Sequence, residues 1–162
     1  MKFLLDTNVF IEAKNRYYAF DICPGFWSWM DVVCGDSVGS IVNVRDELSG
    51  GNDDLSQWAH DRKQAEWFLS VDDEATQNNY ASIANHVAQS NYTPPAIEKF
   101  LGDADSWIIA KSLSLGATVV THERPNPLSK KRVLIPDICN AFNVPYINTF
   151  DALRVLSAQF HL

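Results

Sequence analysis

Residues 103–123 read DADSWIIAKSLSLGATVVTHE, and this stretch decides the class of fold. It begins with acids, carries Ile108, Ile109 and Leu113 at helical spacing, and then reaches Gly116, a residue typical of helix ends. The β-branched run TVVT follows at once and favours a buried strand. We therefore expect a helix over residues 103–115 that leads directly into a strand over residues 117–121.

The rest of the chain repeats this alternation. Further strands are expected at residues 2–5, 38–41, 133–135 and 145–148. Helices are expected at residues 8–13, 24–34, 44–48, 53–69, 72–87, 136–142 and 150–159, with another starting at Pro94. The alternation predicts a three-layer α/β/α architecture with a central parallel sheet. Residues 53–100 lack a strand signal, so we expect them to form an extra helical segment beside the sheet.

Length and charge restrict the function. The 162 residues suit one domain spanning 1–162, and the formal net charge is −7. This charge argues against a protein that binds nucleic acid by bulk positive potential. A metal-dependent nuclease is compatible with it, because bound cations reverse the sign of the potential that a substrate meets.

Cysteine usage and hydropathy indicate a cytoplasmic protein. The three cysteines form no C-x-x-C pair, which argues against a disulfide framework or a zinc motif. The apolar start at residues 3–5 is stopped by Asp6, too early for a secretory signal. Apolar runs stay well below the roughly 20 residues that a membrane span needs, so we expect no membrane association.

Acidic residues are placed where strands end or the following helices begin. Asp6 ends the first strand, Glu47 lies on the helix after the second, Asp103 and Asp105 begin a helix, and Glu123 follows TVVT. The carboxyl ends of parallel strands share one edge of the sheet, so these acids should converge there. Converging carboxylates repel one another unless cations are present, and hard Mg²⁺ or Mn²⁺ ions suit oxygen ligands. We expect a divalent-metal site of this kind to activate a water against a phosphodiester.

Three segments together resemble PIN-domain nucleases: LLDTNVFI at residues 4–11, SIVNVRDEL at 40–48, and the 103–123 block with its D-x-x-I-x-A-x-x-L pattern. The resemblance implies that Asp6, Glu47, Asp105 and Glu123 are catalytic metal ligands, and it places Thr121 beside the last of them. It further implies a Mg²⁺- or Mn²⁺-dependent ribonuclease specific for single-stranded RNA, most closely the toxin of a toxin–antitoxin pair, with a protein antitoxin as partner. The chain departs from the family pattern in its longer helical middle and in having Glu as the fourth acid.

Several residues admit two interpretations. Asp6 could simply cap the next helix, and Asp103 could cap its own helix or act as an auxiliary metal ligand. Asn8 is the better candidate than Thr7 for a supporting contact to Asp6. Basic residues could contact RNA phosphates or could form a solvated loop: Arg124, Lys130, Lys131 and Arg132. The Trp-rich helix at residues 24–34 fits either core packing or a surface for a homodimer or antitoxin.

Two other functions stay open. One is a PIN-like binding module that has lost catalytic activity. The other is a small-molecule phosphohydrolase on an α/β scaffold, which usually needs a D-x-D pair at the first strand. Residue 8 is Asn here, so this pair is missing.

Overall fold

Five short parallel strands form the centre of the molecule. The structure is a computed structural model that describes residues 1–161, so the last residue of the domain expected over 1–162 lies outside it. The strand order is β3-β2-β1-β4-β5. The strands are β1 (Phe3–Leu5), β2 (Val38–Ile41), β3 (Phe68–Leu69), β4 (Thr118–Val120) and β5 (Tyr146–Ile147).

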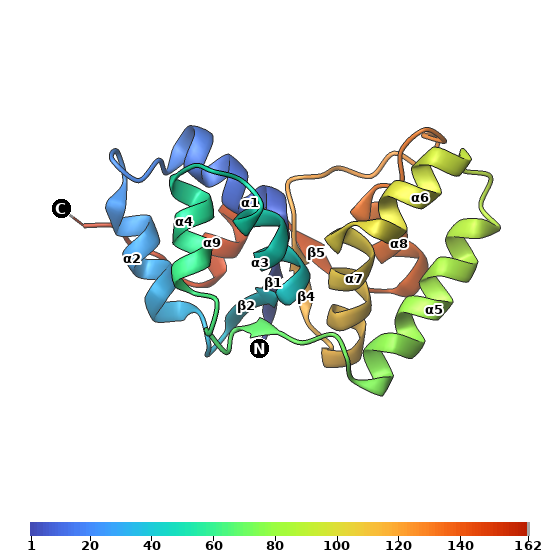
Figure 1. Cartoon of the computed structure of the whole chain (residues 1–162), viewed down its shortest axis with the longest axis horizontal. Coiled ribbons are helices and arrows are strands. Elements are labelled where there is room, and N and C mark those ends of the chain that lie inside the picture. Colours follow the sequence, from blue (N-terminus) through green and yellow to red (C-terminus); the bar gives the residue numbers. More distant parts are fainter. Residues whose placement is uncertain (162) are drawn as a thin grey trace.

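Helices cover both faces of this sheet, with α2, α4 and α9 on one side and α5, α7 and α8 on the other (Figure 1). The helices are α1 (Thr7–Glu12), the π-helix η1 (Ala13–Tyr17), α2 (Pro24–Val33), α3 (Val42–Ser49), α4 (Asp54–Asp61), α5 (Glu74–Ala88), α6 (Pro94–Gly102), α7 (Ala104–Leu115), α8 (Ile135–Phe142) and α9 (Thr149–Val155). The expected α/β/α fold with a parallel sheet is therefore confirmed.

The central strand β1 is held by burial on both faces. It pairs in parallel with β2 on one side and with β4 on the other. Leu4, Ile41 and Val119 are completely buried. Full burial of such a side chain contributes about 1.5–3 kcal/mol, so the continuous apolar runs of these strands fix them at the centre.

Local sequence signals place most elements correctly. The helix expected over residues 103–115 is α7, and Gly116 follows it with φ at +65°, the left-handed conformation that suits glycine. The strand expected at residues 38–41 is β2. At the start of α3 the N-cap residue is Ile41, and the hydroxyl of Ser40 before it makes no capping hydrogen bond within residues 1–161. The Ser40 hydroxyl instead donates to the Leu5 carbonyl oxygen at 2.6 Å, which ties β2 to β1.

Two elements were assigned the wrong type, and the helix expected over residues 150–159 ends at Val155. The helix expected over residues 53–69 ends at Asp61, and Phe68 and Leu69 form strand β3 beside β2. Conversely, the strand expected at residues 133–135 is absent from the described chain, since Ile135 already begins α8. Both errors have one cause: short apolar runs are buried equally well by a strand, a coil or a helix start, so periodicity cannot separate them.

The extra helical segment packs against α7. The Tyr80 ring of α5 stacks on Trp107 of α7 with ring centroids 3.8 Å apart. The Tyr80 hydroxyl donates to the Leu101 carbonyl oxygen of α6 at 3.0 Å. These contacts fix α5 and α6 around the helix that carries Asp105. Across residues 1–161, no helix combines the length and the apolar character needed to cross a membrane.

Candidate metal centre

Asp6 lies at the centre of the carboxyl edge, directly after β1. Its side chain is completely buried. The Thr121 hydroxyl donates to Asp6 Oδ2 at 3.2 Å, whereas Oδ1 has no hydrogen-bond partner within residues 1–161. Asp6 occupies the N-cap position of α1, but in the described chain its carboxylate makes no capping hydrogen bond. The interpretation of Asp6 as a simple helix cap therefore loses its support.

Asp105 projects from the first turn of α7 toward the same edge. Burial raises the pKa of Asp6 well above its usual range, and the charges of Asp105 and Glu123 raise it further. Burial also raises the pKa of Asp105 to about 7, with contributions from Glu123, Glu47 and Asp103. Asp6 and Asp105 are therefore affected by the charges of the other acids, the effect expected of acids that lie at one sheet edge.

Glu47 links three elements of the site. Its Oε2 accepts a hydrogen bond from the Thr7 hydroxyl, and its Oε1 accepts one from the Ala104 amide at 2.8 Å. Ala104 is the first residue of α7, whose leading amides have no partner within the helix. A carboxylate at this position also complements the helix dipole. Glu47 thereby fixes the start of α7, and with it Asp105, against α1.

Glu123 has the corresponding relation to α8. Its Oε2 accepts from the amide of Ile135, the first residue of α8, at 2.7 Å, and its Oε1 accepts from Arg132 at 2.9 Å. The side chain of Glu123 is only 7% exposed. Its own amide donates to the Thr121 hydroxyl oxygen at 3.2 Å, so Thr121 connects Glu123 to Asp6. The two glutamates are thus oriented by helix starts on either side of the aspartates.

Two further residues, Asp103 and Asn8, lack the expected side-chain hydrogen bonds within residues 1–161. Asp103 is the N-cap of α7, but in the part of the chain that is described its carboxylate makes no capping bond. It pairs with Lys99 at 2.6 Å instead. Asn8 makes no side-chain hydrogen bond to Asp6 in residues 1–161, and Thr121 makes the supporting contact in its place. Sequence reasoning missed the Thr7 contact to Glu47, because a threonine after a strand-ending acid looks like a helix cap.

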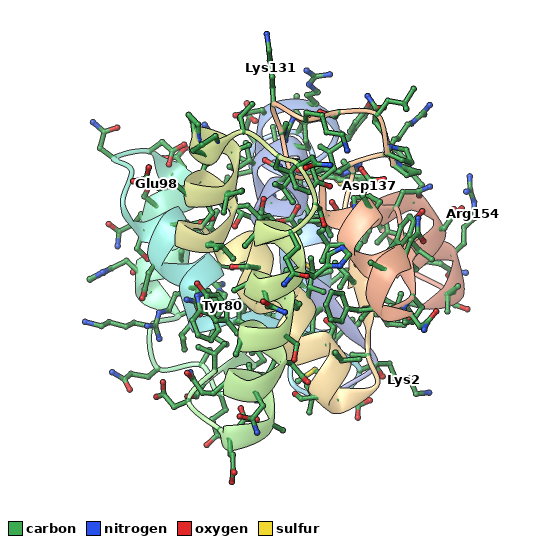
Figure 2. All side chains as sticks on the ribbon, turned by 90° about the vertical axis from the view of Figure 1, so that its right-hand side faces the viewer. Lys2, Tyr80, Glu98, Lys131, Asp137 and Arg154 are labelled. Carbon is green, nitrogen blue, oxygen red and sulfur yellow. The ribbon has the colours of Figure 1, made fainter. Side chains whose placement is uncertain are left out.

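The basic residues lie in the loop between β4 and α8. Lys131 projects into solvent (Figure 2), whereas Arg132 is held by Glu123. The Lys130 ammonium lies 5.5 Å from the centroid of the Tyr92 ring. Asp137 of α8 fixes this loop by accepting a hydrogen bond from the Asn126 amide at 3.0 Å. Only part of this basic stretch is therefore free to meet a substrate.

The donor chemistry fits a hard divalent cation. All four acids offer carboxylate oxygens, the ligands that Mg²⁺ and Mn²⁺ prefer. The buried and unpartnered Oδ1 of Asp6 is the atom that such an ion would satisfy. Among residues 1–161, however, no three acid, histidine or cysteine side chains stand in a ready-made metal cluster. Since Glu47 and Glu123 hydrogen-bond to helix starts, Asp6 and Asp105 are the pair best placed to hold an ion.

The fold recurs in three solved structures. The crystal structure of VapBC2 from Rickettsia felis, bound to a DNA fragment from their promoter, contains a chain 15% identical to this one; the TM-score is 0.56 over 91% of this chain and 98% of that chain. The structure of FitAB bound to an IR36 DNA fragment gives 20% identity and a TM-score of 0.52 over 90% and 94% of the two chains. The crystal structure of FitAcB from Neisseria gonorrhoeae gives 21% identity and a TM-score of 0.54 over 91% of this chain and 98% of that chain.

These likenesses define the class: the chain has a PIN-like α/β fold. The chain belongs to the family described as "Domain of unknown function (DUF4411)", which matches residues 3–160. A search of curated proteins finds no significant match.

Proposed function

We propose that this chain is a Mg²⁺- or Mn²⁺-dependent ribonuclease that hydrolyses phosphodiester bonds in single-stranded RNA, and that it is the toxin of a toxin–antitoxin pair. The observation that carries the proposal is the Asp6–Asp105 pair at the carboxyl edge, with raised pKa values and with one buried oxygen of Asp6 that has no partner among residues 1–161. The carboxylates of such a site repel one another, and a bound cation would reduce that repulsion.

Each residue of the candidate site has its own role in the proposed reaction. Asp6 and Asp105 would hold the cation, with Glu47 and Glu123 as further ligands at its flanks. When bound, a divalent ion supplies a Lewis acid for the phosphodiester and lowers the pKa of an attacking water. Thr121 orients Asp6 through its hydroxyl, and the Ala104 and Ile135 amides hold the two glutamates. This framework keeps the carboxylates in fixed positions, which limits reorganisation during the reaction.

A protein antitoxin belongs to the proposal because the same fold occurs in VapBC2 and FitAB. The motif resemblance to PIN-domain toxins supports the same partner. The exposed Val32 of α2, with 79% of its surface accessible, is one apolar residue that such a partner could cover.

The inactive binding module is the second candidate. It is favoured by one observation: both glutamates already have backbone amides as partners, so they serve the fold whether or not a cation binds. The cleavage experiment separates the two candidates directly.

The test is cleavage of end-labelled single-stranded RNA with Mg²⁺ or Mn²⁺, with and without EDTA. Native protein is compared with Asp6→Asn and Asp105→Asn, and with Asp21→Asn as a control at an exposed carboxylate. We expect cleavage by native protein and by Asp21→Asn, lost in EDTA and in both site variants. Cleavage that survives in Asp6→Asn and Asp105→Asn would refute the assignment. A folded native protein that neither binds metal nor cleaves any RNA would favour the inactive module.

A further inference from the structure

A cavity of about 340 Å³ opens beside Glu123 at the carboxyl ends of β4 and β5. Thr121 and Glu123 belong both to its wall and to the acid cluster. A polynucleotide with a phosphate at the acids would therefore bring its neighbouring nucleoside to this cavity. The volume falls in the range of about 300–1,000 Å³ that is usual for small-molecule pockets.

The wall of this cavity carries flat rings in fixed orientations. His122 shares a hydrogen bond of 2.8 Å between its Nε2 and the hydroxyl of Thr149, a residue that is only 5% exposed. The His122 ring meets Phe150 at 67° with centroids 6.1 Å apart. Tyr146 lies on the same wall. Because Phe150 is 36% exposed, its ring is available to a ligand.

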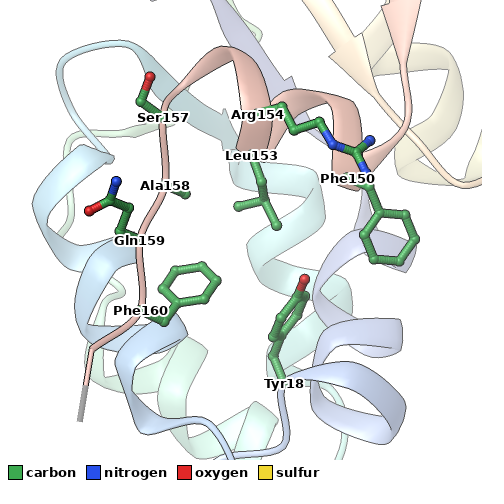
Figure 3. Close-up of a pocket in the computed structure, with 8 residues that line it drawn as sticks. All are labelled: Tyr18, Phe150, Leu153, Arg154, Ser157, Ala158, Gln159 and Phe160. Atoms are coloured by element: carbon green, nitrogen blue, oxygen red, sulfur yellow. The ribbon is translucent and has the colours of Figure 1, made fainter.

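Phe150 also lines a second cavity, of about 510 Å³ (Figure 3). Tyr18 and Phe160 face it, and the Arg154 guanidinium lies next to Phe150 at its rim. Tyr17 also meets Phe150 edge to face, with centroids 5.3 Å apart. Phe150 is thus the shared wall of two adjoining aromatic cavities, of which the first borders the acid cluster.

We propose that these two cavities bind successive unpaired nucleobases of an RNA strand on one side of the scissile phosphodiester, with Phe150 as the stacking residue between them. This inference rests on the proposed ribonuclease function and adds the position of the substrate. Aromatic faces stack on every base and need an unpaired one, because the faces of a paired base are covered by its neighbours.

The charge of the chain favours this mode of binding over a purely electrostatic one. With a net charge of −7, the surface cannot attract RNA by bulk potential. Arg124, which is exposed and lines the first cavity, forms no ion pair within residues 1–161 and is free to meet a phosphate. The Arg154 guanidinium at the second cavity already forms an ion pair with the Asp151 carboxylate at 3.1 Å. Stacking therefore supplies most of the affinity, and the salt dependence should be shallow.

The test is fluorescence anisotropy with dye-labelled oligouridylate, oligoadenylate and oligocytidylate in Ca²⁺, used as a probe of binding apart from cleavage. Phe150→Ala should weaken binding by roughly 5- to 150-fold, the range for loss of one stacking platform. Phe150→Leu, which keeps apolar volume, should also bind more weakly, whereas Phe150→Tyr should bind like native protein. Val155→Ala is the control, because Val155 is exposed on the same helix and lines neither cavity.

The outcomes separate this inference from the proposed function. If folded Phe150→Ala and Phe150→Leu bind like native protein, or if native protein binds none of the three oligonucleotides, the inference is overturned. Metal-dependent RNA cleavage in either case would leave the proposed function intact. Binding that depends on the Phe150 ring, without any metal-dependent cleavage, would support the cavities and overturn the ribonuclease.

Discussion

Neutralising Asp105 should stabilise the metal-free protein. The pKa of Asp105 rises from the usual 3.8 to about 7, with burial as the largest cause. The folded state therefore holds a proton on Asp105 that the unfolded state releases between these two pH values. Free energy of unfolding consequently falls as pH rises from about 4 to about 7, and it stays low above that range. Asp105→Asn removes this loss because the amide has no charge to bury.

The magnitude follows from the shift in pKa. A change from 3.8 to about 7 corresponds to at most about 4 kcal/mol, at ~1.36 kcal/mol for each factor of ten in the equilibrium. For a domain of this size, each kcal/mol moves Tm by roughly 2–4 °C. Metal-free Asp105→Asn should thus melt above native protein by up to on the order of 10 °C at about pH 8. The gap should close near pH 4, where both proteins carry a neutral group.

The assay is thermal unfolding by circular dichroism in EDTA across this pH range, with Asp21→Asn as the matched control at an exposed position. Mn²⁺ or Mg²⁺ should then raise the Tm of native protein more than that of Asp105→Asn, since only the native site keeps its full set of acids. Equal melting of native protein and Asp105→Asn at every pH, with and without metal, would refute the account of Asp105 as a buried, mutually repelled carboxylate.

Three smaller effects follow from individual contacts. Thr121→Val keeps the shape but removes the donor to Asp6 Oδ2, so it should cost about 1–3 kcal/mol in urea unfolding; an unchanged midpoint would argue that the contact is dispensable. Asp73→Ala removes the acceptor for the Thr76 amide at the start of α5 and should cost about 0.5–2 kcal/mol, whereas Asp73→Asn should recover most of that loss. Gly116→Ala forces a side chain into the left-handed conformation at φ +65° and should lower Tm by a few degrees, corresponding to roughly 1 kcal/mol; an equal or higher Tm would contradict the strain argument.

Local sequence signals were sufficient where one residue type determines the backbone. Gly116 ends α7 because it tolerates a positive φ, and the β-branched run after it favours a buried strand. They failed at Phe68 and Leu69, which form a strand only because Ser40 and Ile41 of β2 present a free edge beside them. That edge is a property of the assembled sheet and is invisible in the segment itself.

The candidate metal site shows the same contrast between what the sequence indicates and what the tertiary structure decides. The sequence by itself placed Asp6 and Glu123 just after strands and Glu47 and Asp105 on helices, and a parallel sheet predicts that such acids share its carboxyl edge. Only the tertiary structure decided how those acids differ. Glu47 accepts a hydrogen bond from an amide 57 residues away, and Glu123 from one 12 residues away, while Asp6 keeps a buried oxygen without a partner in the described chain. Such contacts depend on where α7 and α8 begin in space. The first amides of a helix have no partner within it, so they donate to whichever acceptor the packing places beside them.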